Sequence, residues 1–137
     1  MDRVDAPAEQ MTPATDAAAA GHQLPQSIDI LKIMQSIPHR YPFLLIDKMV
    51  EIHAGQSAIG IKNVTVNEPL FQGHFPSLPV LPRALTVDAM AQTAATLVVM
   101  TLGAAFVGKL AHFMTLGYAK LRPPPGPGDP LPLPIDT

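Results

Sequence analysis

The sequence predicts an α+β domain in which an antiparallel sheet packs around one long, apolar helix. Two strand-forming segments, residues 43–52 and 57–66, flank a short turn, as in an antiparallel hairpin. Residues 83–102 are predicted to form a helix that is apolar on nearly all sides, so another layer must cover it. Hydrophobic residues make up 47% of the 137 residues, which is enough to bury such a core in one domain.

The first expected element is a helix over residues 27–37. Its isoleucines and methionine recur at helical spacing, and Ser27 is suited to cap its N-terminus. Pro38 and Pro42 then end the helix. The hairpin follows, with "FLLIDKMVEI" and "SAIGIKNVTV" as its strands and Gly55 free to adopt positive φ in the turn "HAGQ".

The long helix is expected to begin after Pro82, because proline is tolerated at the start of a helix. Twenty uncharged residues separate Asp88 from Lys109, which is long enough to span a bilayer. However, this segment is rich in Ala, Thr and Gly, and neither an aromatic belt nor a basic cluster flanks it. We therefore expect a buried helix of a soluble fold and no membrane span. Residues 109–121 are expected to supply another strand.

Composition predicts a tail at each end of the chain. Residues 1–26 lack the basic and apolar regions of a signal peptide, and their low hydrophobicity is typical of a disordered tail. Residues 123–137 contain seven prolines, which favour an extended, polyproline-like path outside a sheet. The expected domains are a tail over residues 1–26, a folded domain over residues 27–122 and a Pro-rich tail over residues 123–137.

The totals argue against several classes of function. A formal net charge of -2 disfavours binding to nucleic acid. The absence of cysteine excludes disulfides and thiolate nucleophiles and fits a reducing compartment. No two of the five histidines have metal-ligand spacing, so no metal site is expected.

Two isolated titratable residues are candidates for acid–base chemistry. His74 lies between Gly73 and Phe75, so its ring is expected beside apolar groups that favour the neutral, basic imidazole. Asp88 lies in the second turn of the long helix among apolar residues, which is expected to raise its pKa and let it donate a proton. Gln92 follows one helical turn later and could orient the carboxylate or a water. Such a pair suits proton abstraction with protonation of a leaving group.

Structural roles explain the same residues. A single histidine in a proline-rich loop is commonly structural, and an aspartate near a helix start commonly complements the helix dipole. Gln92 can equally be a hydrogen-bonded residue without a catalytic role.

Three separated motifs, "PHRYPFLLIDK", "KNVTVNEPLFQGHFP" and "AMAQTA", resemble the 3-hydroxyacyl-acyl-carrier-protein dehydratase family in order and spacing. The resemblance covers roughly residues 28–129. It implies a hot-dog fold, an antiparallel sheet wrapped around a long central helix. We expect this fold to be incomplete at its C-terminal end, because the family continues with further strands after "PGD".

The resemblance also implies the chemistry of a cytoplasmic lyase without a cofactor. A (3R)-3-hydroxyacyl chain on acyl carrier protein would lose water to give the trans-2-enoyl product, in the synthesis of fatty acids or lipid A precursors. The family forms its sites at a dimer interface, with the histidine from one subunit and the carboxylate from the other, and commonly assembles as a trimer of dimers. His74 matches the histidine that takes the α-proton. Asp88 matches the carboxylate that protonates the departing hydroxyl.

The start of the long helix would bind the substrate. A backbone N–H there, near Arg83 and Ala84, would polarise the thioester carbonyl. The acyl chain would lie along the helix, lined by Met90, Ala94 and Val98.

Two departures from the family pattern leave other functions open. Asp88 replaces the usual glutamate, and Arg83 replaces a glycine that lets the thioester approach the backbone. One alternative is therefore a catalytically impaired hot-dog remnant that binds acyl thioesters or associates with an intact partner. Another is a thioesterase of the same fold.

Overall fold

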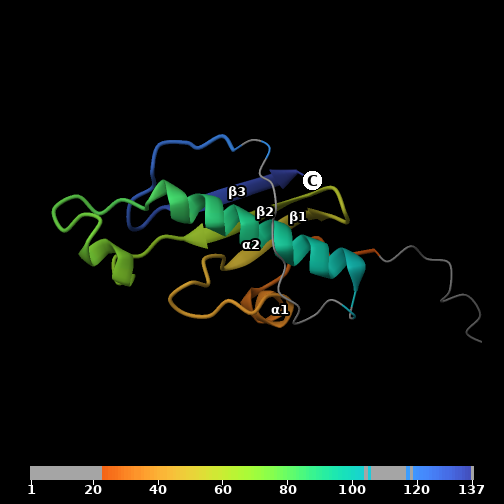
Figure 1. Ribbon diagram of the computed structural model, residues 1–137. Coiled ribbons are helices and arrows are strands. Elements are labelled where there is room, and N and C mark those ends of the chain that lie inside the picture. The colour runs from red at the N-terminus through yellow and green to blue at the C-terminus, as the bar shows by residue number, and fades with distance from the viewer. Residues whose placement is uncertain (1–22, 104, 106–116, 118, 137) are drawn as a thin grey trace, which may run out of the picture.

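The computed structural model describes residues 23–103, 105, 117 and 119–136. Its elements are, in order, α1 (Ile30–Ser36), β1 (Lys48–His53), β2 (Ser57–Asn63), the 3-10 helix η1 (Pro69–Gln72), α2 (Arg83–Leu102) and β3 (Pro130–Asp136). The three strands form an antiparallel sheet of order β1-β2-β3, and α2 lies across one face of it (Figure 1). The predicted α+β class is confirmed.

The hairpin is confirmed, although its strands are shorter than expected. β1 and β2 pair antiparallel, and Gly55 in the turn adopts a φ of 64°. Alternate residues of β2, namely Ala58, Gly60 and Lys62, are buried on the face toward the core. β2 ends at Asn63, so residues 64–66, which were expected to continue the strand, lie outside it.

α2 has the bounds that the sequence predicts, Arg83–Leu102. It lies so close to β2 that a Cβ added at Gly60 would collide with the side chain of Thr93. By length and composition alone α2 could cross a bilayer, but 44% of its most apolar window is buried inside the protein. The contact with β2 is consistent with the core helix of a soluble fold.

The predicted start of α1 is wrong. The helix begins at Ile30, and its N-cap is Asp29, whose carboxylate accepts a hydrogen bond of 3.1 Å from the Lys32 N–H. Ser27 cannot cap it because Ile28 is held extended by two hydrogen bonds to Met49 of β1, at 3.0 and 3.1 Å. A tertiary contact therefore shortens the helix.

The predicted Pro-rich tail is wrong for residues 130–136, which form β3 along the whole of β2. Leu131, Leu133 and Ile135 lie opposite Lys62, Gly60 and Ala58. Successive residues of a strand direct their backbone groups to opposite sides. If the leucines and Ile135 direct their N–H groups toward β2, the nitrogen atoms of the intervening prolines, which carry no hydrogen, lie on the side away from β2.

Hydrogen bonds on either side of β2 support this orientation. Odd-numbered residues face β1, since the Asp47 N–H donates to the Ile61 carbonyl and the Asn63 N–H donates to the Asp47 carboxylate. Val64 faces the β3 side, because its N–H donates to the Asp129 carbonyl at 3.1 Å. The prolines of β3 therefore lie along the edge with which no described strand pairs, where proline is tolerated.

Two other expectations fall mostly outside the described residues. Of the strand expected over residues 109–121, only 117 and 119–121 are described, and they are not in a strand. Of the tail expected over residues 1–26, only 23–26 are described. Leu24 packs against the core, and the Gln26 carbonyl accepts a hydrogen bond of 3.2 Å from Ile52.

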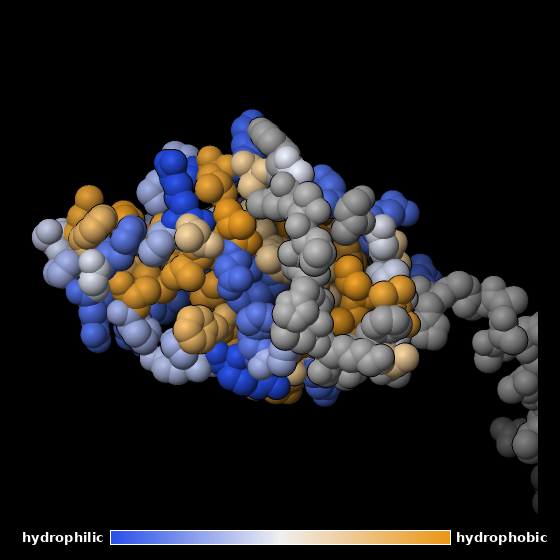
Figure 2. Space-filling view, in the orientation of Figure 1, coloured by the Kyte–Doolittle hydropathy of each residue, from blue (hydrophilic) through white to orange (hydrophobic). Residues whose placement is uncertain are grey.

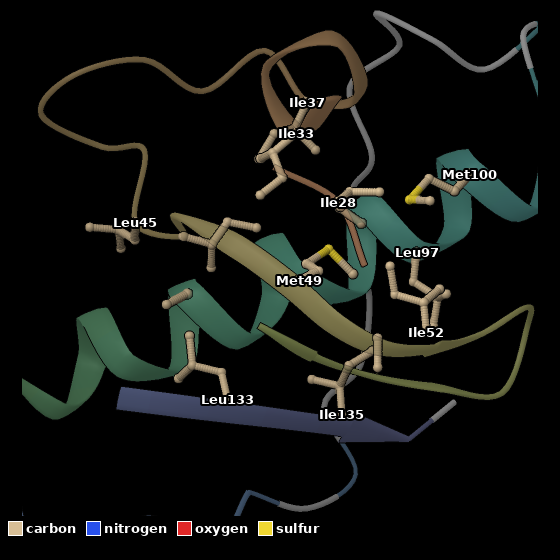
Figure 3. Packing of buried hydrophobic residues seen from close by; sticks show 14 residues of the cluster. Ile28, Ile33, Ile37, Leu45, Met49, Ile52, Leu97, Met100, Leu133 and Ile135 are labelled. Atoms are coloured by element: carbon tan, nitrogen blue, oxygen red, sulfur yellow. The ribbon is translucent and has the colours of Figure 1, made fainter. Parts of the chain in front are cut away.

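Side chains from α1, α2 and the three strands pack together in the main core (Figure 3). Ile33 of α1, Met49 of β1, Leu97 of α2 and Leu133 of β3 are all almost completely buried. A second, smaller cluster contains Val64, Phe71 and Leu81. This second cluster anchors the segment between β2 and α2, where the candidate histidine lies.

Candidate active site

His74 lies in the segment that joins β2 to α2, and hydrogen bonds fix both its backbone and its ring. Its N–H donates to the Leu70 carbonyl at 3.1 Å, and its carbonyl accepts from the Val80 N–H at 3.3 Å. Its ring atom Nδ1 lies 3.0 Å from the Val80 carbonyl oxygen. A carbonyl only accepts hydrogen bonds, so the proton of the neutral ring resides on Nδ1. Nε2 then presents a lone pair, and no partner for it is found among the described residues.

One apolar group, Phe75, is shown against the His74 ring, and other apolar residues of the same segment face solvent. The ring stacks on Phe75 with centroids 4.3 Å apart. Phe75, Leu78 and Val66 are at least half exposed. Apolar surface appears at the end of the molecule where the β2–α2 segment projects (Figures 1 and 2). His74 itself is only partly buried, so this chain alone leaves the ring accessible.

Asp88 lies in the second turn of α2 and is exposed, contrary to the apolar enclosure that we expected. The reason is the helical geometry. Ala89, which follows it, is completely buried, and successive helical residues point about 100° apart. The buried Ala89 thus faces another side of the helix and does not enclose Asp88. The Asp88 carboxylate accepts a hydrogen bond of 2.9 Å from the Gln92 amide.

Gln92 is buried and makes three hydrogen bonds. Its Oε1 accepts from the Leu45 N–H at 2.9 Å, and its Nε2 donates to the Phe43 carbonyl at 2.7 Å as well as to Asp88. The Gln92 side chain therefore joins α2 to the segment before β1 and holds the carboxylate at the same time. This position of Gln92 is consistent with a role in orienting Asp88 and with a purely structural role.

The start of α2 presents backbone N–H donors. The N–H groups of Leu85 and Thr86 donate to the Pro82 carbonyl, at 3.0 and 3.2 Å. For those of Arg83 and Ala84 no acceptor is found among the described residues. Both of these side chains are exposed.

The expected acyl-binding residues Met90, Ala94 and Val98 lie one helical turn apart along α2 and are partly buried. Two surface hollows lie elsewhere, one beside α1 and β1 and the other beside Glu51 and Ile135. Neither is lined by His74 or Asp88, and no hydrogen bond joins these two residues within the described chain. Among the described residues, no three acidic or histidine side chains form a metal-binding group.

An ion pair between buried Lys62 and partly buried Glu68, at the start of the segment that leads to His74, was missed in the sequence. Lys62 Nζ lies 2.7 Å from Glu68 Oε1, and the two side chains are only 5% and 18% exposed. A signal was available, since Lys62 shares the alternating, core-facing side of β2 with Ala58 and Gly60. A lysine in such a position needs a buried partner.

Comparisons with known proteins agree with the motifs. The family model of a FabA-like domain matches residues 37–136. The chain is 82% identical over 136 residues to a 3-hydroxyacyl-[acyl-carrier-protein] dehydratase FabZ of Gluconobacter oxydans, covering 99% of this chain and 80% of that protein. The FabZ of Gluconacetobacter diazotrophicus is 66% identical over 106 residues, covering 77% of this chain and 66% of that protein. That of Paramagnetospirillum magneticum is 58% identical over 111 residues, covering 81% and 69%. Together with the antiparallel sheet packed on α2, these matches confirm the predicted hot-dog class.

Proposed function

Since this chain belongs to the FabA-like family, we propose that it removes water from a (3R)-3-hydroxyacyl chain carried on acyl carrier protein. The product is the trans-2-enoyl thioester. The relatives named above are dehydratases of such substrates by their names. The observation that carries the proposal is the hydrogen bond of 3.0 Å from His74 Nδ1 to the Val80 carbonyl, because it leaves Nε2 as a base.

His74 Nε2 takes the proton from C2 of the acyl chain, and the electrons of that C–H bond form the C2–C3 double bond. The C3–O bond breaks, and protonated Asp88 gives its proton to the departing hydroxyl, which leaves as water. His74 then holds one extra proton and Asp88 lacks one, so proton transfer between them restores the starting state. No redox change occurs, and no cofactor takes part.

The remaining site residues bind the substrate. The free N–H groups of Arg83 and Ala84 polarise the thioester carbonyl, as donors at a helix start can. Met90, Ala94 and Val98 line the path of the acyl chain along α2. Gln92 orients the Asp88 carboxylate through the 2.9 Å hydrogen bond.

The site closes between two copies of the chain. Exposed Asp88 and the accessible ring of His74 both support this arrangement, since a reaction of this kind needs a site shielded from water. The exposed Phe75 and Leu78 provide apolar surface for a partner subunit. The active unit is a homodimer, arranged further as a trimer of dimers. It acts in the cytoplasm on fatty acid or lipid A precursors.

The test is a turnover assay of the purified full chain with a 3-hydroxybutyryl thioester, following formation of the enoyl product. His74→Ala and Asp88→Asn are each expected to lower kcat by at least about 100-fold. His53→Ala and Asp136→Asn are matched controls on exposed residues and should keep parental activity. A folded oligomer without turnover would instead support acyl binding alone, and thioester hydrolysis without enoyl product would support a thioesterase.

A further inference from the structure

The ion pair of Lys62 and Glu68 lies at the point where β2 leaves the sheet. Glu68 uses both carboxylate oxygens, since Oε1 lies 2.7 Å from Lys62 Nζ and Oε2 accepts from the Thr65 N–H at 3.0 Å. Its backbone N–H also donates to the Thr65 carbonyl at 3.3 Å. Glu68 therefore closes the turn over residues 65–68 and attaches it to the core-facing side of β2.

A short series of hydrogen bonds connects this turn to His74. The Glu68 carbonyl accepts from the Phe71 N–H at 3.1 Å at the start of η1. The Leu70 carbonyl then accepts from the His74 N–H, also at 3.1 Å. Phe71 is 4% exposed and packs with Val64, so this packing holds η1 in place directly before His74 in the chain. Movement of Glu68 would displace η1 and, with it, the backbone of His74.

Lys62 also relates the position of this turn to α2, the helix that carries Asp88. It lies on the same face of β2 as Gly60, whose backbone approaches Thr93 of α2 more closely than any side chain at that position would allow. The ion pair therefore joins the segment that carries the histidine to the face of β2 that packs against α2.

We expect the charges of this pair to add little stability, provided that an acceptor for the Thr65 N–H is kept. Burying two charges costs desolvation free energy that their attraction does not always repay, and apolar replacements of buried ion pairs are often neutral or stabilising. An ion pair, however, holds its two atoms in one geometry, whereas apolar side chains tolerate sliding. A charged pair at this place therefore suits a turn that must be held in a fixed position.

We infer that Lys62 and Glu68 form a positioning pair that fixes the His74 imidazole for the reaction. The inference rests on the proposed function for its catalytic consequence, but the placement of the ring is independent of turnover. A ring displaced by about 1 Å loses roughly 100-fold in rate. The Nδ1–H bond to Val80, which selects the tautomer, should weaken with the same displacement.

The test compares the parental chain with the double variant Lys62→Met/Glu68→Gln, which removes both charges, keeps all but the terminal atom of the lysine length and keeps an oxygen for the Thr65 N–H. Lys48→Met is the matched control, an exposed lysine of the neighbouring strand. Three quantities are measured, namely the melting temperature, kcat with KM for a 3-hydroxybutyryl thioester, and the ¹⁵N signals of the histidine rings. His74→Gln assigns the signal of His74.

The expected result is a double variant that melts close to the parental chain, with kcat lowered about 10- to 100-fold and KM changed less than about threefold. Its His74 signal should lose the strong preference for the Nδ1–H tautomer, while Lys48→Met changes none of the three quantities. A folded double variant with parental His74 signals overturns the inference. If the parental chain itself lacks turnover, the proposed function fails, and the ring signals still decide the positioning role.

If the double variant does not fold, Glu68→Asp replaces it. This substitution keeps the charge and shortens the side chain by one methylene, so the ion pair survives only if the turn moves. The inference then requires changed His74 signals, and unchanged signals overturn it.

Discussion

The Gln92 amide donates a hydrogen bond of 2.9 Å to the Asp88 carboxylate from one helical turn away, and it also donates to the Phe43 carbonyl at 2.7 Å. One buried side chain therefore carries both the stability of the contact between α2 and the segment before β1 and the orientation of an exposed acid. These two contributions can be separated by substitution.

Gln92→Met keeps the volume of the side chain and removes all three hydrogen bonds. The buried Leu45 N–H then lacks a partner, which costs about 1–3 kcal/mol of unfolding free energy. Urea denaturation should show this loss. Gln92→Glu retains an acceptor for Leu45 but, like Gln92→Met, lacks the amide donor to Asp88, so we expect kcat to fall in both variants. Parental kcat in both variants would contradict the orienting role.

Gly60→Ala should destabilise the fold, because the new Cβ meets the Thr93 side chain. Overpacking of this kind costs about 1–3 kcal/mol. Thr93→Ala removes the two outer atoms in its path and should recover part of the loss in the double variant. Gly73→Ala is the control, since a Cβ there has no neighbour within 4 Å. Thermal unfolding of the parental chain, the two single variants and the double variant gives the coupling free energy, and a value near zero would refute the close approach.

The prolines of β3 should protect the sheet edge that lacks a partner among the described strands. Replacing Pro130, Pro132 and Pro134 together by threonine restores three outward N–H donors, which can pair with a strand of another molecule. We expect self-association that increases with protein concentration in sedimentation velocity experiments. Pro124→Thr, outside any strand, is the control. Unchanged sedimentation of the triple variant would show that this edge is not available to a partner strand.

Arg83→Gly tests whether the arginine obstructs the thioester. Its side chain is exposed at the first position of α2, so we expect it to lie clear of the carbonyl pocket. The change in kcat/KM should correspond to less than about 1 kcal/mol, or roughly fivefold. A gain of 100-fold in a steady-state assay would instead identify Arg83 as an obstruction.

Local sequence was sufficient for α2 and for the hairpin. The bounds of α2 follow from Pro82 at its start and Gly103, with a φ of 89°, at its end. The hydrogen bond between Gln92 and Asp88 also follows from sequence, because residues four apart in a helix are neighbours.

Tertiary contacts decided the elements that the sequence pattern misrepresented. Ile28 is extended because β1 offers it partners, and β3 exists because its prolines fall on the side away from β2. The number of prolines shows how many backbone N–H donors a segment lacks. Only the register of strand pairing shows on which edge of the strand those donors are missing.

The sequence by itself determined the family, the long helix and the residue types of the site. Only the tertiary structure decided that Asp88 is exposed, that His74 carries its proton on Nδ1, and that Lys62 meets Glu68. The physical reason is common to all three. Exposure, tautomer and ion pairing depend on atoms from another element, such as Ala89 facing the sheet or the carbonyl of Val80, and no periodicity within a single segment specifies where those atoms lie.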